Sequence, residues 1–402
     1  MPIIIISNLY LQLRAFLQNK VKYFSILLVG CTIGYGIFLI TKGNHYPLAF
    51  LKPLMKWSGE SLFGDIKQIK TIPLLIEEGL DPYVVPQGTL NIPLAYPPIW
   101  IWIAQTFQLQ IDLHFYTFVS IYIVSYIAIL LYFMMKSNTI WYLLLFFSTP
   151  SLLGIDRGSN DILVFDILFL IAMILRSKNI YAQWLAGIPL LFAGAIKIFP
   201  FAGILAFRNI ILALILLACA GLYLYFNLEY LHYVMTYTQI IDFPRLSYGA
   251  LLLFPNINGL VKVLLLGTLL AIVPLILLYL NKNKSALLTI IETQNSHLSF
   301  NQLLYVLGAS CYCLSFFSHT NWDYRLIMLF LCFPLLLQHK NHIVIQSILI
   351  FHLLVFYTGV IQLGLLNQIL KFLIWYFHAI ILLKHIYSNF TPLKFDLKKV
   401  KL

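Results

Sequence analysis

Long apolar runs separated by short polar segments extend over most of this chain. They occupy residues 23–41, 115–135, 140–155, 162–175, 180–207, 210–226, 259–280, 303–317, 326–337, 343–363 and 366–383. A helix that crosses a bilayer needs about 20 apolar residues. The run 180–207 contains Pro189, Lys197 and Pro200 and is too long for one straight span, so we expect it to break and return. Counted as two spans, it brings the prediction to about twelve transmembrane helices in an all-α polytopic membrane protein.

The composition agrees with lipid as the solvent. Of 402 residues, 61% are hydrophobic and 10% are charged, and the mean hydropathy is +0.89. Soluble domains have about 45–50% apolar and about 25% charged residues, which excludes an ordinary soluble globule. The five cysteines lie within or beside apolar runs and imply no disulfide framework. Without a repeat or a linker, residues 1–402 are expected to form one integral domain.

The formal net charge of +12 is explained by membrane topology. If the basic segment before residue 23 is cytoplasmic, fifteen lysines and arginines fall in cytoplasmic segments beside only two acids, as the positive-inside rule requires. Both termini are then cytoplasmic, and the basic tail 394–401 is expected near anionic lipid headgroups. The charge does not indicate a nucleic-acid partner.

Most acidic residues fall on the opposite face, and five of them lie in one long loop within residues 42–113. They are Glu60, Asp65, Glu77, Glu78 and Asp81. Long loops in compact proteins tend to be functional. A helical pattern follows Asp65 and ends at Gly79, and Pro97-Pro98 is expected to open a short, tryptophan-containing helix over 99–107. We therefore expect an outer loop with juxtamembrane helices.

Asp65 is the carboxylate in this loop that draws attention first. It follows the first predicted span closely, so it is expected near the headgroup plane, facing the membrane-embedded part of the protein. The alternative is that Asp65 is simply the N-cap of the helix that follows, a position that aspartate often occupies.

A second polar group, Gly154 to Asp161, forms a predicted turn between two spans on the outer side. Arg157 carries a permanent charge with five donors, which suits a phosphate. A structural salt bridge to Asp156 or Asp161 is the alternative. Asp166 lies within the next span, where an ionisable residue is a functional candidate unless it pairs with a neighbouring helix.

Two further cationic groups complete the set. Lys197 lies at the expected break in 180–207, where an ammonium needs an anion or a water-filled cavity, unless it snorkels to the interface. The outer turn 318–325 contains His319 and Arg325, both suited to a phosphate. For Trp322 and Tyr324 in the same turn we favour a role as interfacial belt residues.

Several common chemistries lack their usual motifs. The sequence contains no paired histidines at zinc spacing, no phosphate-binding glycine loop of nucleotide-driven transporters, no dinucleotide fingerprint and no serine-hydrolase elbow. We therefore expect neither a metal nor a cofactor.

The order of these motifs resembles the C-type glycosyltransferases, and among them the bacterial polyprenol-phosphate-mannose-dependent mannosyltransferases of family 87. The matching elements are Asp65, Asp81-Pro82-Tyr83, Tyr96-Pro97-Pro98, Arg157-Gly158-Ser159-Asn160, Lys197-Ile198-Phe199-Pro200 and His319. Two elements depart from the family pattern. A serine separates Gly158 from Asn160, and two residues separate Lys197 from Pro200, which is similar to the lysine-aromatic-proline element of eukaryotic dolichol-phosphate-mannose enzymes.

The resemblance implies a C-type glycosyltransferase fold in the bacterial cell membrane, with the active site on the outer face. It implies Asp65 as the catalytic residue and a donor-phosphate site formed by Arg157, Lys197, His319 and Arg325. It also implies a group of substrate-binding residues, namely Asp81, Tyr83, Tyr96, Asn160 and Asp161.

The expected activity is inverting transfer of a hexose, with mannose as the first choice, from a polyprenyl phosphate to a hydroxyl of a lipid or glycan acceptor. Asp65 would accept the hydroxyl proton, and the cations would stabilise the departing phosphate. Besides the donor and the acceptor, membrane lipids are the expected partners. The alternatives are a transporter or flippase, for which Lys197 and Asp166 would be the pathway charges, and a polymerase or ligase of lipid-linked glycans.

Overall fold

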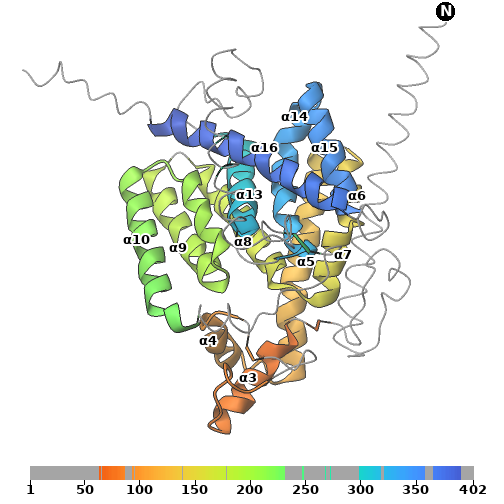
Figure 1. Ribbon diagram of the computed structural model, residues 1–402. Coiled ribbons are helices and arrows are strands. Elements are labelled where there is room, and N and C mark those ends of the chain that lie inside the picture. The colour runs from red at the N-terminus through yellow and green to blue at the C-terminus, as the bar shows by residue number, and fades with distance from the viewer. Residues whose placement is uncertain are drawn as a thin grey trace, which may run out of the picture. The chain divides into compact units, whose positions relative to one another are not determined.

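The computed structural model describes residues 63–64, 66–86, 93–94, 96–137, 139–177, 179–230, 247–248, 268, 272, 298–317, 321–357 and 365–390. These residues form helices and one antiparallel pair of two-residue strands, β1 (Ser247–Tyr248) and β2 (Asn321–Trp322) (Figure 1). The all-α class is thereby confirmed. The predicted span 23–41 and nearly all of 259–280 lie outside the described residues.

The chain divides into two compact units, Met1–Asp166 with His232–Thr238, and Ile167–Leu231 with Gln239–Leu402. The first unit contains α3 (Lys67–Glu77), α4 (Ile99–Thr106), α5 (Asp112–Ser137), α6 (Trp141–Phe146), α7 (Thr149–Arg157) and the start of α8 (Asn160–Leu175). The second contains the rest of α8, α9 (Ile180–Ile196), η2 (Phe199–Ala206), α10 (Ile210–Phe226), α13 (Phe300–Phe317), η5 (Asp323–Cys332), α14 (Phe333–Gln338), α15 (Ile343–Phe356) and α16 (Leu365–Phe390).

The structure contains two helices within the predicted loop 42–113, α3 and α4, while their place at the membrane stays a prediction. α3 ends near Gly79, which adopts a left-handed conformation with φ of 73°, and Pro98 is the N-cap of α4. Trp100 of α4 is fully buried, whereas Trp102 is 58% exposed, so α4 has one covered face and one open face. α3 and α4 pack against each other.

The predicted run 140–155 is wrong as one continuous helix. The structure divides it into α6 and α7, with Ser148 extended at the N-cap of α7 and Pro150 in its first turn. Proline lacks the N–H that a continuing helix would need, and its ring clashes with the carbonyl four residues earlier. An apolar composition does not reveal such an interruption.

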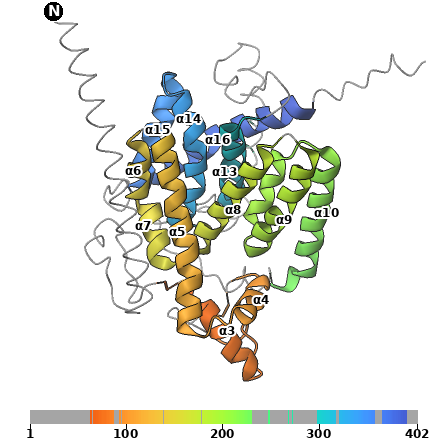
Figure 2. The ribbon, with the colours of Figure 1, turned by 180° about the vertical axis from the view of Figure 1, so that it is seen from behind.

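The predicted break in 180–207 is confirmed. α9 ends at Ile196, Lys197 is extended with φ of −150°, and η2 begins at Phe199. η2 folds back onto α9 and packs tightly against it. The Phe201 ring lies so close to Gly194 that an added Cβ would be only 2.2 Å from it. α10 lies beside α9 in both views (Figure 1, Figure 2).

α13 and α16 run antiparallel and share a polar seam in the second unit. Tyr305 of α13 bonds His378 of α16, and Tyr312, two turns further along α13, bonds Lys371, two turns earlier in α16. Residues seven apart lie on one helical face, so both helices turn one stripe toward each other. α15 packs against α16 as well.

Among the described residues, two helices are long and apolar enough to cross a membrane, α5 and Leu366–Tyr387 of α16. α7 and α8 pass the same test as a pair, bent by 112° at their junction. α9, α10, Arg325–Gln338 and α15 are shorter apolar segments. These helices support a helical membrane protein, while the number of twelve spans stays a prediction.

Candidate functional site

Asp65 and His319, two of the residues predicted to act on substrate, lie outside the described residues. The chain on both sides of Asp65 is described, and Phe63, Gly64 and Ile66 are all buried. The N-cap of α3 is Ile66, which makes no side-chain capping bond. The capping role offered as the alternative for Asp65 also lies outside the described residues and stays a prediction.

The polar group that carries Arg157 packs directly against this chain. The Phe63 N–H donates a 2.7 Å hydrogen bond to the Asp156 carbonyl. A Cβ added to Gly158 would lie 2.9 Å from the Phe63 ring and 3.0 Å from Ile66. The Asp65 motif and the Arg157 motif are about ninety positions apart in the sequence. The structure nevertheless brings the residues next to Asp65 into contact with Gly158.

Phe63 has a strained backbone at this contact. Its φ is 61°, a left-handed value that is a real outlier for a bulky residue. The ring is fully buried, and the N–H bond to Asp156 fixes the conformation. Such strain costs of order 1–3 kcal/mol and persists only where the surroundings determine it, most often at functional sites.

The predicted turn within 154–161 is reduced to Gly158 and Ser159. α7 continues through Arg157, Gly158 ends it with φ of 58°, and α8 starts at Asn160. Asp156, Arg157, Asn160 and Asp161 are each at most 3% exposed. The apolar rings of Phe63 and Tyr122 cover the segment, and Tyr122 donates a 2.6 Å bond to the Gly158 carbonyl.

Two residues of this segment have a local structural role. The Asp161 N–H bonds the Ser159 hydroxyl oxygen at 3.2 Å, and the Ser159 hydroxyl donates to the Asp161 carboxylate at 3.0 Å. Ser159 thus caps α8, and Asp161 lies in its first turn, where a negative charge is favourable. Asp166, further along α8, has both carboxylate oxygens enclosed, with Ser125 as its polar neighbour.

The predicted substrate-binding residues of the outer loop come together. The Asp81 carboxylate accepts the Tyr83 N–H at 2.8 Å, and the Tyr83 hydroxyl donates to the Tyr96 carbonyl at 2.9 Å. The Tyr96 ring packs beside Trp100 of α4, with centroids 6.0 Å apart. Because Asp81 is exposed and both tyrosines are half-buried, this group forms an accessible surface.

In the second unit, the structure brings Lys197 and Arg325 to one aromatic ring. The Lys197 ammonium and the Arg325 guanidinium each lie 5.9 Å from the centre of the Phe199 ring. Both cationic side chains are half-buried, and Phe199 itself is buried. Attraction between a cation and a ring face is worth about 0.5–1 kcal/mol at exposed sites and more where water is excluded. Two residues predicted separately as phosphate ligands therefore share one location.

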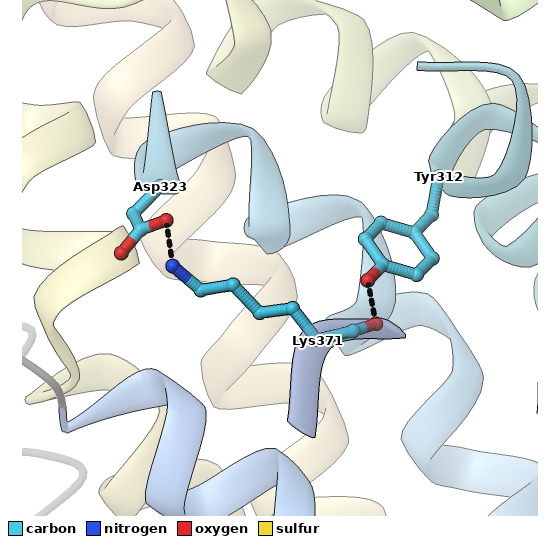
Figure 3. A network of polar contacts seen from close by, with 3 residues as sticks. All are labelled: Tyr312, Asp323 and Lys371. Carbon is cyan, nitrogen blue, oxygen red and sulfur yellow. Dashed lines mark hydrogen bonds and ion pairs between the residues drawn. The ribbon is translucent and has the colours of Figure 1, made fainter. Parts of the chain in front are cut away.

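The carboxylate closest in sequence to Arg325 is held by another lysine. The Lys371 ammonium lies 2.6 Å from the Asp323 carboxylate, and both side chains are completely buried (Figure 3). Tyr312 donates a 2.9 Å bond to the Lys371 carbonyl from the other side of α16. The Asp323 carboxylate is therefore neutralised by Lys371.

The sequence interpretation did not single out Lys371. The available signal was a lysine in the middle of the apolar run 366–383, since ionisable residues inside spans are functional candidates by default. Its partner was not predictable, because Asp323 is 48 positions away.

A chain of buried polar groups, also missed, links α13, α16 and α15. Tyr305 bonds the His378 Nδ1 at 2.7 Å, the Nε2 atoms of His378 and His352 are 3.2 Å apart, and the His352 Nδ1 lies 2.6 Å from the Ile348 carbonyl. A carbonyl only accepts, so His352 carries its proton on Nδ1. His378 then donates from Nε2 and accepts from the Tyr305 hydroxyl on Nδ1, and two neutral rings satisfy every bond.

Near Asp65, burial and the charge of Lys70 lower the pKa of Lys67, which is half-buried at the start of α3. Lys70 pairs with Asp112 at the start of α5. In the part of the chain that the structure describes, no three His, Cys, Asp or Glu side chains are arranged to hold a metal ion.

Comparisons with family models, with curated proteins and with solved structures gave no match. The resemblance to C-type glycosyltransferases therefore stays a prediction, supported by this chain's own residues alone.

Proposed function

We propose that this protein is an inverting membrane glycosyltransferase that moves a hexose, with mannose as the first candidate, from a polyprenyl phosphate to a hydroxyl acceptor. The observation that carries the proposal is the meeting of Lys197 and Arg325 at Phe199. Cationic side chains beside one buried ring are suited to an anionic group such as a phosphate. A polyprenyl phosphate provides such an anionic group, and its hydrocarbon tail suits the surrounding lipid.

The reaction requires one bond to form while another breaks. The acceptor oxygen bonds the anomeric carbon from the face opposite the phosphate, and the bond from that carbon to the phosphate oxygen breaks. The electron pair of the broken bond stays with the polyprenyl phosphate, where Lys197 and Arg325 stabilise the developing charge. The acceptor proton passes to Asp65, a step for which a positioned base contributes about 10²–10⁴-fold.

Support for Asp65 comes from its neighbours along the chain. Gly64 and Ile66 are buried, and Phe63 and Ile66 contact the segment that carries Arg157. The N–H bond to Asp156 and the burial of the ring fix the strained backbone of Phe63, two positions before Asp65. Arg157 itself is buried, only 3% exposed, in the segment that these residues contact.

The test is sugar transfer by the purified full chain with labelled polyprenyl-phosphate mannose as the donor and membrane lipid extract as the acceptor. Lys197→Gln and Arg325→Gln should each lower kcat by about 10²-fold, a typical cost of losing one charge-stabilising donor. Lys136→Gln, which removes an exposed lysine at the end of α5, is the matched control and should transfer normally. Equal rates in all four proteins would contradict the proposed phosphate site.

A transporter of lipid-linked glycans is the second candidate. It is favoured by the fully buried Lys371–Asp323 pair and by the breaks at Lys197 and at Gly158, because transporters use interrupted helices and intramembrane charges. Vesicles containing the protein and labelled polyprenyl-phosphate mannose separate the two functions. Movement of the lipid across the bilayer without any change in its sugar bond would favour the transporter.

A further inference from the structure

The second unit contains a small cavity that the proposed reaction does not use. Its accessible volume is about 60 Å³. Its polar lining consists of Arg176 and Ser177 after α8, Gln183 in α9 and Arg208 before α10, while Leu175 and Leu303 contribute apolar walls. A water molecule needs about 10–15 Å³ of such volume, so the space suits roughly four waters or one phosphate-sized group.

The cavity carries two positive charges and has no acidic lining. Neither Arg176 nor Arg208 makes an ion pair with a carboxylate among the described residues. The Nε atom of Arg208 is enclosed and has no hydrogen-bond partner among the described residues. Burial lowers the pKa of Arg208, yet a guanidinium keeps its charge at any physiological pH. An enclosed charged donor of this kind is stabilised by an anion.

Helix capping does not explain this arrangement. The N-terminus of α10 is already capped by the Asn209 side chain, which accepts the N–H groups of Ile211 and Leu212. The Gln183 side chain in turn accepts the Asn209 N–H at 3.1 Å. Arg176 follows the C-terminus of α8, where a cation is favourable, but this accounts for only one of the two guanidinium groups.

We propose that this cavity binds the phosphate headgroup of an anionic phospholipid. Two guanidinium groups offer paired donors whose geometry matches phosphate oxygens. The leucines beside them suit the glycerol and the first acyl carbons. Basic pockets between membrane helices are known to bind anionic headgroups, and the expected topology puts Arg176 and Arg208 on the cytoplasmic side. The inference is independent of the proposed sugar transfer.

The test counts lipids bound to the full chain in neutral detergent by native mass spectrometry, with phosphatidylglycerol and phosphatidylcholine as probes. The wild type should hold one phosphatidylglycerol in preference to phosphatidylcholine. Arg176→Gln combined with Arg208→Gln should weaken that binding at least tenfold, since hydrogen bonds to charged groups are the strong ones. Arg208→Lys keeps the charge but loses the paired geometry and should weaken binding severalfold.

The matched control removes two positive charges elsewhere. Lys136→Gln combined with Lys340→Gln changes two exposed lysines expected on the same face and should leave the binding unchanged. Equal binding by the wild type and the double arginine variant, or an equal loss in the control, would overturn the proposal. Inorganic phosphate at millimolar concentration should not displace the lipid. Displacement at that concentration would assign the site to a soluble anion and overturn the lipid assignment.

Discussion

The Lys371 ammonium and the Asp323 carboxylate form a 2.6 Å ion pair from which solvent is completely excluded. The pair connects α16 to the start of η5, two residues before Arg325. It therefore fixes the backbone from which Arg325 reaches Phe199. The Asp323 carboxylate has Lys371 as its partner, while Arg325 lies beside the Phe199 ring.

Breaking this pair should destabilise the protein strongly. Lys371→Met leaves the Asp323 carboxylate buried without its cation, which costs about 3–5 kcal/mol. Lys371→Met combined with Asp323→Leu should recover most of that loss, because apolar residues of similar volume replace buried pairs well. The free energy of unfolding in mixed micelles measures both.

The Lys70–Asp112 pair is the matched control for this comparison. Its side chains are 30% and 71% exposed, so Lys70→Met should change the free energy of unfolding by about 0–1 kcal/mol. If Lys371→Met cost no more than Lys70→Met, the buried pair would have no structural role.

The polar chain from Tyr305 to His352 predicts a definite pair of tautomers. Nitrogen NMR of labelled histidine should find the proton on Nδ1 in His352 and on Nε2 in His378. Tyr305→Phe leaves the His378 Nδ1 atom without its donor and should cost about 1–3 kcal/mol. The opposite tautomer at His352 would contradict the proposed direction of hydrogen-bond donation, from Tyr305 through His378 and His352 to the Ile348 carbonyl.

Gly158 and Gly79 form a matched pair for testing the contact beside Asp65. Both have left-handed backbones, with φ of 58° and 73°, so alanine is strained at either. At Gly79 nothing lies within 4 Å of an added Cβ, and Gly79→Ala should cost about 1–2 kcal/mol through the backbone conformation alone.

At Gly158 the added methyl also collides with Phe63 and Ile66. Gly158→Ala should therefore cost several times as much as Gly79→Ala in unfolding free energy and lower sugar transfer besides. Similar effects of the two substitutions on both measurements would show that the packing of Gly158 on Phe63 is unimportant.

Acidification should destabilise the connection between α14 and α15. Burial, together with the charge of the neighbouring His342, lowers the pKa of His339. The unfolded chain then binds its proton at a higher pH than the folded one, so stability falls as the pH drops below about 6.5. His339→Gln should reduce the loss of Tm between pH 7.5 and 5.5, and an unchanged loss would contradict this role of His339.

Local signals predicted much of the helical pattern. The run 210–226 coincides with α10, and the break at Lys197 followed from the prolines around it. The interruption at Ser148 was missed because it depends on where Pro150 falls in a helix rather than on polarity.

Tertiary contacts were beyond the reach of sequence reasoning. Arg157 was expected in a polar turn and is buried at the end of α7, where Phe63 and Tyr122 from distant positions contact the adjacent Gly158. The pairing of Lys371 with Asp323 was also not predictable, because the two residues are 48 positions apart in the sequence. Residue types suggested Lys197 and Arg325 as anion ligands, but only their common position at Phe199 relates them to each other.

The most direct test of sugar transfer is the anomeric configuration of the product. Full-length protein is incubated with polyprenyl-phosphate mannose labelled at the anomeric carbon, and the product is analysed by NMR. We predict a glycoside with the configuration opposite to that of the donor, formed by the wild type and absent with Asp65→Asn. A product of retained configuration, or unchanged transfer by Asp65→Asn, would contradict the account.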